Sequence, residues 1–121
     1  MFTCNIDRSH WALAVIFMEK STIQFYDSMG GDGYKYTLAL WKYLKDEWAD
    51  KKGGELPNQK NWRIIGNRDY VPHQDNGFDC GVFTCVFADC LSLDRPLSFD
   101  QRYVTQCRDR IALSILNGAA M

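Results

Sequence analysis

Apolar runs separated by short polar segments predict a set of strands in the first half of the chain. Residues 11–17 (WALAVIF) are almost continuously apolar and rich in β-forming side chains, which is typical of a buried central strand. A polar turn at 18–21 separates this run from a second β-forming segment at 22–26. A third, shorter strand is expected at 62–65. The first two strands should pair as an antiparallel hairpin, because the turn between them is short.

The first predicted helix covers about residues 34–52. Gly53 follows it, and glycine commonly ends helices. The next segment, 54–61, is polar and contains Pro57, so it is expected to be a loop. The helix is indicated by apolar residues that recur three or four positions apart: Leu38, Trp41, Leu44 and Trp48.

A second helix is expected over about residues 80–93. The preceding segment, 71–78, contains turn-forming proline, aspartate, asparagine and glycine. Asp79 follows this segment in the position of an N-terminal helix cap. One face of the helix is apolar: Phe83, Val86, Phe87, Cys90 and Leu91.

The last helix is expected after Pro96, where Ser98 and Gln101 have the spacing of a capping box. It should end at residues 117–118, and residues 119–121 are expected to be a frayed tail. The resulting order β-β-α-β-α-α predicts a small α+β fold, with a mixed sheet and flanking helices in a single domain. The apolar face of this last helix comprises Val104, Cys107, Ile111 and Ile115.

Composition excludes several classes of protein. With 121 residues and a net charge of −1, the chain has neither the basic surface of a nucleic-acid-binding protein nor a polybasic patch for membranes. Its apolar runs are too short to span a bilayer, and no signal peptide is apparent. The cysteines are odd in number and form no CxxC pair, which argues against a disulfide scaffold or a zinc site and for a reducing compartment. They are Cys4, Cys80, Cys85, Cys90 and Cys107.

Cys80 has the setting of a nucleophile. A helix N-terminus favours the thiolate through its free N–H groups and dipole, and Cys80 sits at the expected start of its helix. Gly81 follows, and a residue without Cβ lets a substrate backbone approach the sulfur closely. Cys85 and Cys90 lie inside the same helix and are interpreted as core residues.

A base and its partner are expected at the open end of the predicted hairpin. His10 immediately precedes the strand at 11–17, and Asp27 directly follows the strand at 22–26. Both are almost equally far from the turn, so they should lie within a residue or two of being opposite one another. A carboxylate beside an imidazole fixes its tautomer and stabilises the imidazolium. Gln74, six residues before Cys80, offers an amide that could stabilise an oxyanion together with the Cys80 N–H.

Each of these residues also has a structural interpretation. Cys80 could simply open a helix, His10 could be a hydrogen-bonded strand-end histidine, and Asp27 could form a turn. Gln74 could be a solvated loop residue. His73 is an alternative base, since it is nearer to Cys80 in sequence. The individual signals are weak, and their combination favours a cysteine nucleophile with a histidine base.

Three segments carrying these residues resemble the SUMO-specific protease family, also called Ulp or sentrin-specific proteases. They are HWALAVI, IQFYDSMG and VPHQDNGFDCGVFTC. In that family a His-Trp pair opens a strand, Tyr-Asp-Ser ends the next, and a Gln-x-Asn-x-x-Asp-Cys-Gly block carries the nucleophile. The segments LWKYLKDEW and FDQRYVTQCRDRI are similar too, so the resemblance covers nearly the whole chain.

The resemblance implies a papain-like cysteine protease core of the Ulp/adenain type. It implies that Cys80 is the nucleophile, His10 the base, Asp27 its orienting residue and Gln74 the oxyanion donor. Trp11 corresponds to the tryptophan that roofs the tunnel for the modifier's tail, although by itself it could be a core aromatic at the start of a strand. Such a tunnel admits only Gly-Gly, which has no side chains. Gly81, directly after Cys80, is expected to contact the same part of the modifier.

The function that the resemblance implies is hydrolysis after the terminal glycine of SUMO or a related ubiquitin-like protein, in conjugates or precursors. No metal or organic cofactor is expected, and a nuclear or cytoplasmic location fits the family. Family catalytic domains are longer, and the absent part precedes His10, so the chain is expected to be a partial catalytic domain. The strand at 11–17 should then have uncovered apolar surface.

The sequence leaves the substrate and the activity open. A protease for NEDD8 or ubiquitin would carry the same four chemical groups, and a non-catalytic module that binds a ubiquitin-like partner is a further alternative. The oligomeric state is not indicated by the sequence.

Overall fold

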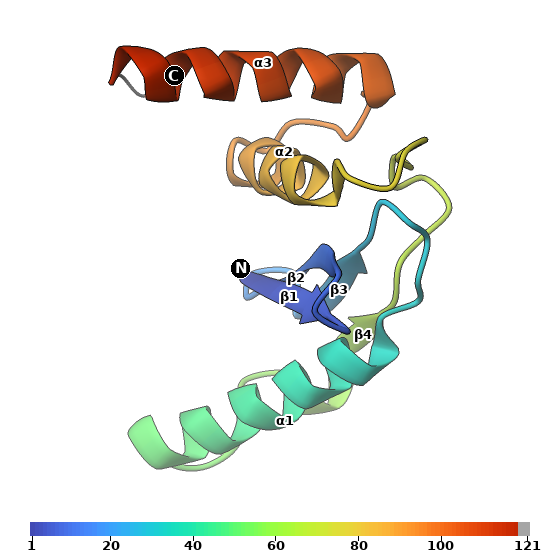
Figure 1. Cartoon of the computed structure of the whole chain (residues 1–121). Coiled ribbons are helices and arrows are strands. Elements are labelled where there is room, and N and C mark those ends of the chain that lie inside the picture. Colours follow the sequence, from blue (N-terminus) through green and yellow to red (C-terminus); the bar gives the residue numbers. More distant parts are fainter. Residues whose placement is uncertain (119–121) are drawn as a thin grey trace.

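The structure, a computed structural model, describes residues 1–118. A four-stranded sheet lies between one helix on one face and two helices, one above the other, on the opposite face (Figure 1). The expected tail at 119–121 lies outside the described residues. The elements are β1 (Phe2–Ile6), β2 (His10–Phe17), β3 (Thr22–Tyr26), α1 (Tyr34–Lys51), a 3₁₀ turn η1 (Gln59–Asn61), β4 (Arg63–Ile65), α2 (Cys80–Ser92) and α3 (Gln101–Asn117).

The sheet has the order β1-β2-β3-β4 and is mixed. The first three strands are antiparallel, whereas β4 runs parallel to β3. The expected strands and helices are confirmed within a few residues at their ends. The fold is therefore a small α+β fold with a mixed sheet and flanking helices, as the sequence predicts.

Strand β1 is absent from the sequence prediction. It pairs along its whole length with β2, from Phe2 opposite Ala14 to Ile6 opposite His10. As an edge strand it is largely exposed, so its hydrophobic signal is weak. With β1 in place, β2 is paired on both edges, which confirms the predicted central strand. His10 is the first residue of β2 rather than the residue before it.

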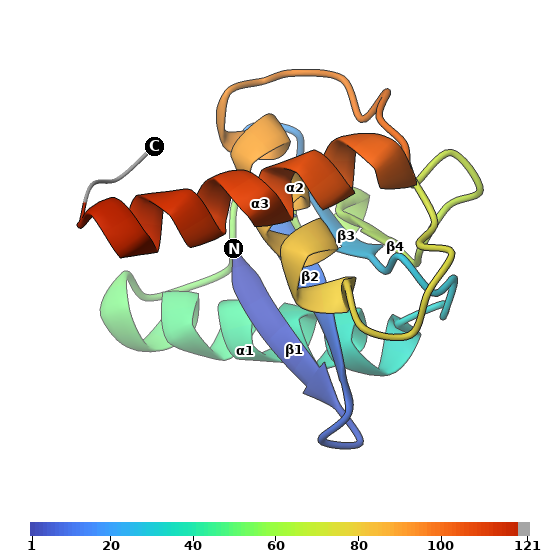
Figure 2. The same cartoon turned by 45° about the horizontal axis from the view of Figure 1, so that its top comes forward.

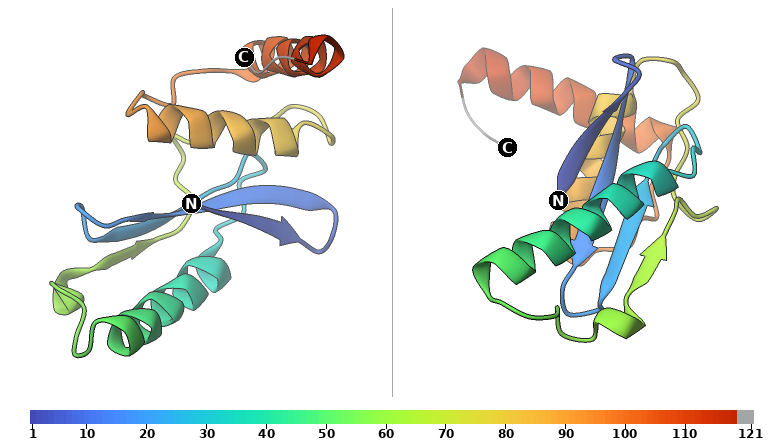
Figure 3. Two further views of the ribbon diagram at one scale, coloured as in Figure 1. Left: turned by 90° about the vertical axis from the view of Figure 1, so that its left-hand side faces the viewer. Right: turned by 90° about the horizontal axis from the view of Figure 1, so that it is seen from below.

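The expectation of uncovered apolar surface on β2 holds at Trp11, which is exposed, and is wrong for the middle of the strand. Ala12, Leu13, Ala14 and Val15 are all buried. Because side chains alternate across a strand, the two alanines face α1 and the larger pair faces α2. Figures 2 and 3 show the sheet covered on both sides in this way.

Phe25 is the centre of the core under α1. Its ring stacks on Tyr36 with 5.7 Å between centroids. Gly33 directly precedes α1 with φ +72°, and a Cβ there would overlap the Phe25 ring. Leu38, expected on the inner face of α1, is exposed, and the buried residue of this helix is Thr37.

The helix caps differ from the predicted ones. Asp79 occupies the N-cap position of α2, but its carboxylate makes no capping hydrogen bond and bonds to other side chains instead. Helix α3 starts at Gln101, so Ser98 lies too early for the predicted capping box. Asp100 caps this helix, accepting a hydrogen bond from the Tyr103 N–H at 3.2 Å.

Among the described side chains, those of α3 that pack on α2 lie in the first half of the helix. Val104 is fully buried against α2, whereas Ile111 is exposed and Ile115 is 75% exposed. The helix crosses over α2, and its second half extends past it (Figures 1 and 3). The predicted apolar face of α3 is therefore covered at one end only. Among residues 1–118, no helix has the length and apolar character needed to cross a membrane.

Candidate active site

The hairpin of β2 and β3 brings His10 and Asp27 together at its open end. Leu13 pairs with Tyr26, which places Asp27 two positions from being opposite His10. The His10 Nε2 and the Asp27 Oδ1 are 2.5 Å apart, and both side chains are largely buried. An ionised carboxylate can only accept, so Nε2 carries the proton and Nδ1 is the free position of the neutral ring. Nδ1 is buried and has no hydrogen-bond partner among the described residues.

Asp27 is fixed from both its backbone and its side chain. Its N–H donates to the Asn67 Oδ1 and its carbonyl accepts from the Asn67 Nδ2, each at 3.0 Å. Its carboxylate also accepts the N–H groups of Met29 at 2.8 Å and Gly31 at 3.2 Å. Asn67 is missed by the sequence analysis, since it lies 40 positions from Asp27 in an unremarkable loop after β4. These bonds hold the carboxylate in the orientation that meets the imidazole.

Cys80 is the first residue of α2 and is buried. The backbone N–H of Trp11 donates to its Sγ at 3.5 Å. Trp11 directly follows His10, so this contact brings the thiol beside the strand that carries the imidazole. As the first residue of α2, Cys80 also lies at the end of the helix whose free N–H groups and dipole favour negative charge.

Gln74 lies in the loop before α2 and is held by Ser28. Its N–H donates to the Ser28 carbonyl at 2.9 Å, and the Ser28 hydroxyl donates to its Oε1 at 2.5 Å. One hydrogen of its amide is used by the Asn76 carbonyl, with 2.6 Å between nitrogen and oxygen. An amide nitrogen carries two hydrogens, so a second donor remains for a ligand.

Trp11 and Gly81 face each other at the start of α2. The indole of Trp11 is 43% exposed. A Cβ added at Gly81 would lie 3.8 Å from the indole Cδ1, so the ring covers the first turn of the helix. Trp11 is thus a surface aromatic rather than a core residue.

The remaining candidates lie in other surroundings. The His73 Nδ1 is bonded to the Val71 carbonyl at 3.0 Å, and its ring packs against Gly30. Cys85 is exposed, which corrects its interpretation as a core residue, whereas Cys90 is buried. Burial raises the pKa of the Cys90 thiol and also that of Cys4. Among residues 1–118, no cluster of three histidine, cysteine or acidic side chains is suited to a metal ion.

The structure places a thiol at the start of α2 and, on the strand β2 that contacts it, an imidazole bonded to a carboxylate. Cysteine proteases use these three groups together. Comparison with known proteins narrows this class. The model of the Ulp1 protease family, C-terminal catalytic domain, matches residues 2–119. The chain therefore belongs to this family, and the resemblance noted in the sequence is confirmed.

Two proteins with similar sequences are both named as specific proteases. Sentrin-specific protease 2 of Homo sapiens is 37% identical over 109 residues, which are 89% of this chain and 18% of that protein. Ubiquitin-like-specific protease 1 of Saccharomyces cerevisiae is 33% identical over an alignment of 119 residues, which covers 95% of this chain and 18% of that protein.

Solved structures of Ulp1 protease domains also match the chain. The yeast Ulp1 protease domain in complex with Smt3, the yeast orthologue of SUMO, matches with a TM-score of 0.73 at 30% identity. That match covers 95% of this chain and 50% of the solved one. The SUMO protease Ulp1 with its catalytic cysteine oxidised to a sulfonic acid matches with a TM-score of 0.79 at 32% identity, covering 96% and 51%. The chain thus spans about half of the solved domains that it matches and about a fifth of the full-length relatives.

Proposed function

We propose that the chain is a cysteine-type isopeptidase and endopeptidase that removes SUMO, or a related ubiquitin-like modifier, after its C-terminal Gly-Gly. The observation that carries the proposal is the contact of Trp11 with the Cys80 sulfur beside the His10–Asp27 pair. Membership of the Ulp1 protease family and the names of its similar proteins support the choice of modifier.

In the proposed reaction, His10 accepts the Cys80 proton at Nδ1, the ring nitrogen opposite the one bonded to Asp27. The sulfur attacks the glycine carbonyl, and the carbonyl oxygen becomes negative. The Cys80 N–H and the second amide hydrogen of Gln74 stabilise that oxygen. His10 then donates its proton to the leaving amine as the C–N bond breaks, which leaves a thioester.

Water completes the cycle. His10 takes a proton from a water molecule, whose oxygen attacks the thioester carbonyl. The C–S bond breaks, and the proton held by His10 passes to the sulfur. The modifier leaves as a carboxylic acid, which loses the second proton of the water to solvent. Asp27 stabilises the imidazolium in both halves of the reaction.

Trp11 and Gly81 are proposed to hold the tail of the modifier. The exposed indole above a residue without Cβ leaves room for an extended backbone but little for side chains. This geometry favours a Gly-Gly sequence directly before the scissile bond. The partner would accordingly be a ubiquitin-like protein and its conjugates.

An alternative is a module that binds a ubiquitin-like partner without cleaving it. The observation that favours it is the coverage, because the chain spans about half of the solved protease domains. A related protease for NEDD8 or ubiquitin is the alternative within the same chemistry. We further infer a nuclear or cytoplasmic location, supported by the five free cysteines of the structure.

The test is covalent labelling of the purified 121-residue chain with SUMO bearing a C-terminal vinyl sulfone. NEDD8 and ubiquitin probes run in parallel, and Cys80→Ala is the control. We expect a SUMO adduct that forms with the wild type and not with the variant. Preferential labelling by the NEDD8 or ubiquitin probe would identify that modifier as the substrate instead of SUMO. The absence of any adduct from a folded chain would favour the module that binds without cleaving.

A further inference from the structure

Asp79 is a buried carboxylate that the proposed reaction does not use. It directly precedes Cys80 and is only 2% exposed. Its Oδ1 accepts from the Arg108 Nη1 at 2.6 Å, and its Oδ2 accepts from the Asn76 Nδ2 and the Gln101 Nε2, each at 2.9 Å. A buried charge is tolerated only when it is paired and fully hydrogen-bonded. These three donors are therefore required to keep the Asp79 carboxylate buried.

Two of the three donors come from α3. Gln101 and Arg108 are seven positions apart and therefore lie on the same face of that helix. Gln101 holds the loop at a second point, because its Oε1 accepts the N–H of Asp75 at 2.9 Å. Asp75 follows Gln74, so Gln101 bonds at both ends of the loop that carries the proposed oxyanion donor and leads to Cys80.

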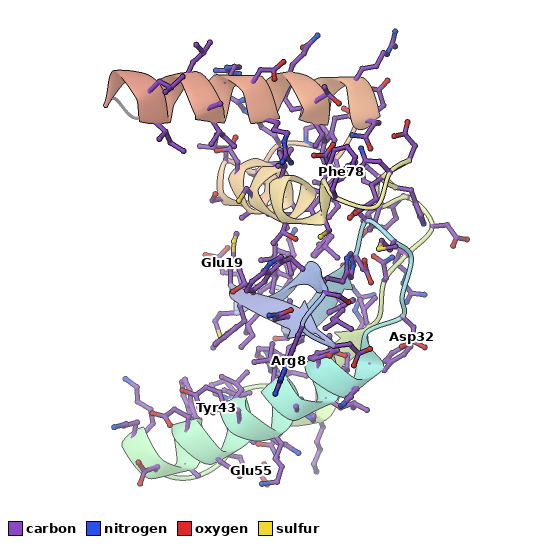
Figure 4. The ribbon with its side chains drawn as sticks, viewed as in Figure 1. Arg8, Glu19, Asp32, Tyr43, Glu55 and Phe78 are labelled. Atoms are coloured by element: carbon purple, nitrogen blue, oxygen red, sulfur yellow. The ribbon has the colours of Figure 1, made fainter. Side chains whose placement is uncertain are left out.

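Arg108 makes a further contact with the same loop. Its guanidinium lies 5.6 Å from the centre of the Phe78 ring, which is 67% exposed. Figure 4 shows Phe78 between the start of α2 and α3. A guanidinium that both pairs with a carboxylate and stacks on an aromatic face is held in one orientation.

We propose that Arg108 and Gln101 are positioning residues, which act through Asp79 to fix the 74–79 loop and the start of α2. In this way α3 sets the place of the Cys80 sulfur and of the Gln74 amide, although neither α3 residue touches the reacting atoms. The inference rests on the proposed function, since it assigns these residues a part in that reaction. Displacement of a reacting group by about 1 Å costs on the order of 10²-fold in rate, so the effect is measurable.

The first experiment compares Arg108→Gln with Arg102→Gln in the full chain. Arg102 lies on the same helix and also pairs with an aspartate, Asp100, but both of these side chains are exposed. We expect Arg108→Gln to lower the maximal rate of vinyl-sulfone labelling by about 10- to 100-fold per folded molecule, with little change in the half-saturating probe concentration. Arg102→Gln should label like the wild type. Equal maximal rates for the two variants would overturn the proposal.

Loss of Arg108 also leaves the buried Asp79 charge unpaired, so we expect the single variant to lose stability. The double variant Asp79→Asn with Arg108→Gln removes both charges and should recover stability in urea denaturation. We expect its labelling rate to stay low, because an uncharged pair no longer draws the loop to α3. If the double variant recovers both stability and rate, the contact is merely structural and the proposal fails.

A small reagent separates this inference from the proposed function. The rate of Cys80 alkylation by iodoacetamide reports on the sulfur without any modifier protein. We expect Arg108→Gln and the double variant to alkylate Cys80 more slowly than the wild type, while Cys85 reacts at an unchanged rate. If no modifier probe labels the wild type but this difference is found, positioning holds and the proposed substrate is wrong. If probes label the wild type and Cys80 alkylates equally in all variants, the positioning inference is wrong.

Discussion

The backbone N–H of Trp11 donates a hydrogen bond to the sulfur of Cys80, with 3.5 Å between nitrogen and sulfur. The two residues are 69 positions apart in the chain. The contact joins the start of β2 to the start of α2. Because His10 precedes Trp11, the contact also places the thiol next to the residue that follows the imidazole paired with Asp27. The proposed chemistry therefore depends on the packing of α2 against the sheet as much as on the motif residues.

Asp27→Asn should reduce the rate far more than the stability. An asparagine amide would face the His10 Nε2 and favour the wrong tautomer, which costs about 10⁴-fold in a comparable triad. Asparagine keeps one of the two oxygens that accept from Met29 and Gly31, so the stability loss should be about 1 kcal/mol. Probe labelling per folded molecule and urea denaturation measure the two effects. A large stability loss with an unchanged rate would mean that Asp27 only forms the turn.

Ser28→Ala should weaken the site through Gln74. The serine hydroxyl is the donor that fixes the Gln74 Oε1, so its loss lets the amide rotate. We expect about a tenfold lower labelling rate, roughly the value of one hydrogen bond, against 10²- to 10³-fold for Gln74→Ala. The double variant should be no slower than Gln74→Ala, because both changes act on the same amide. Additive losses would contradict this coupling.

Gly33→Ala should be among the most destabilising single-methyl changes. Its φ of +72° disfavours a side chain, and the added Cβ would overlap the Phe25 ring. We expect a loss of about 3 kcal/mol or more from strain and overpacking together. Gly53→Ala is a matched control, since φ is +75° there and nothing lies within 4 Å of the added Cβ, so about 1 kcal/mol is expected. Equal losses of unfolding free energy for the two variants in urea denaturation would contradict this prediction. They would show that the Phe25 ring moves aside at little cost.

Alkylation of Cys90, which is buried, and of Cys4, which is half-buried, should depend on pH in a defined direction. Burial raises the pKa of the Cys90 thiol, and the nearby Asp89 carboxylate raises it further, while burial alone raises the pKa of Cys4. A raised thiol pKa means less thiolate at neutral pH, so iodoacetamide should modify both more slowly than the exposed Cys85 at pH 7. Their rates should climb as the pH passes above the ordinary thiol range. Peptide mass spectrometry measures each site, and equal rates of Cys90 and Cys85 at pH 7 would contradict the assignment.

The sequence by itself determined the parts of the fold whose interactions are local. The apolar run of β2, the turn after it and β3 predict a hairpin, and the hairpin register alone places His10 near Asp27. Helical periodicity likewise predicts α1 and α2, and the start of α2 is at Cys80. Each of these inferences needs only a few neighbouring residues, because hydrogen bonds and side-chain periodicity within one element or one tight turn leave few alternatives.

Tertiary structure alone decided which residues far apart in the chain contact one another. The pairing of β1 with β2, the clamp of Asn67 on Asp27 and the contact of Trp11 with Cys80 all depend on how separate elements pack. Asp79 shows the difference most clearly: its sequence position predicts a helix cap, but a cationic side chain from α3 is a stronger partner for a buried carboxylate than the helix N–H groups. Sequence spacing does not encode such choices, because they are set by which donors the folded chain brings within reach.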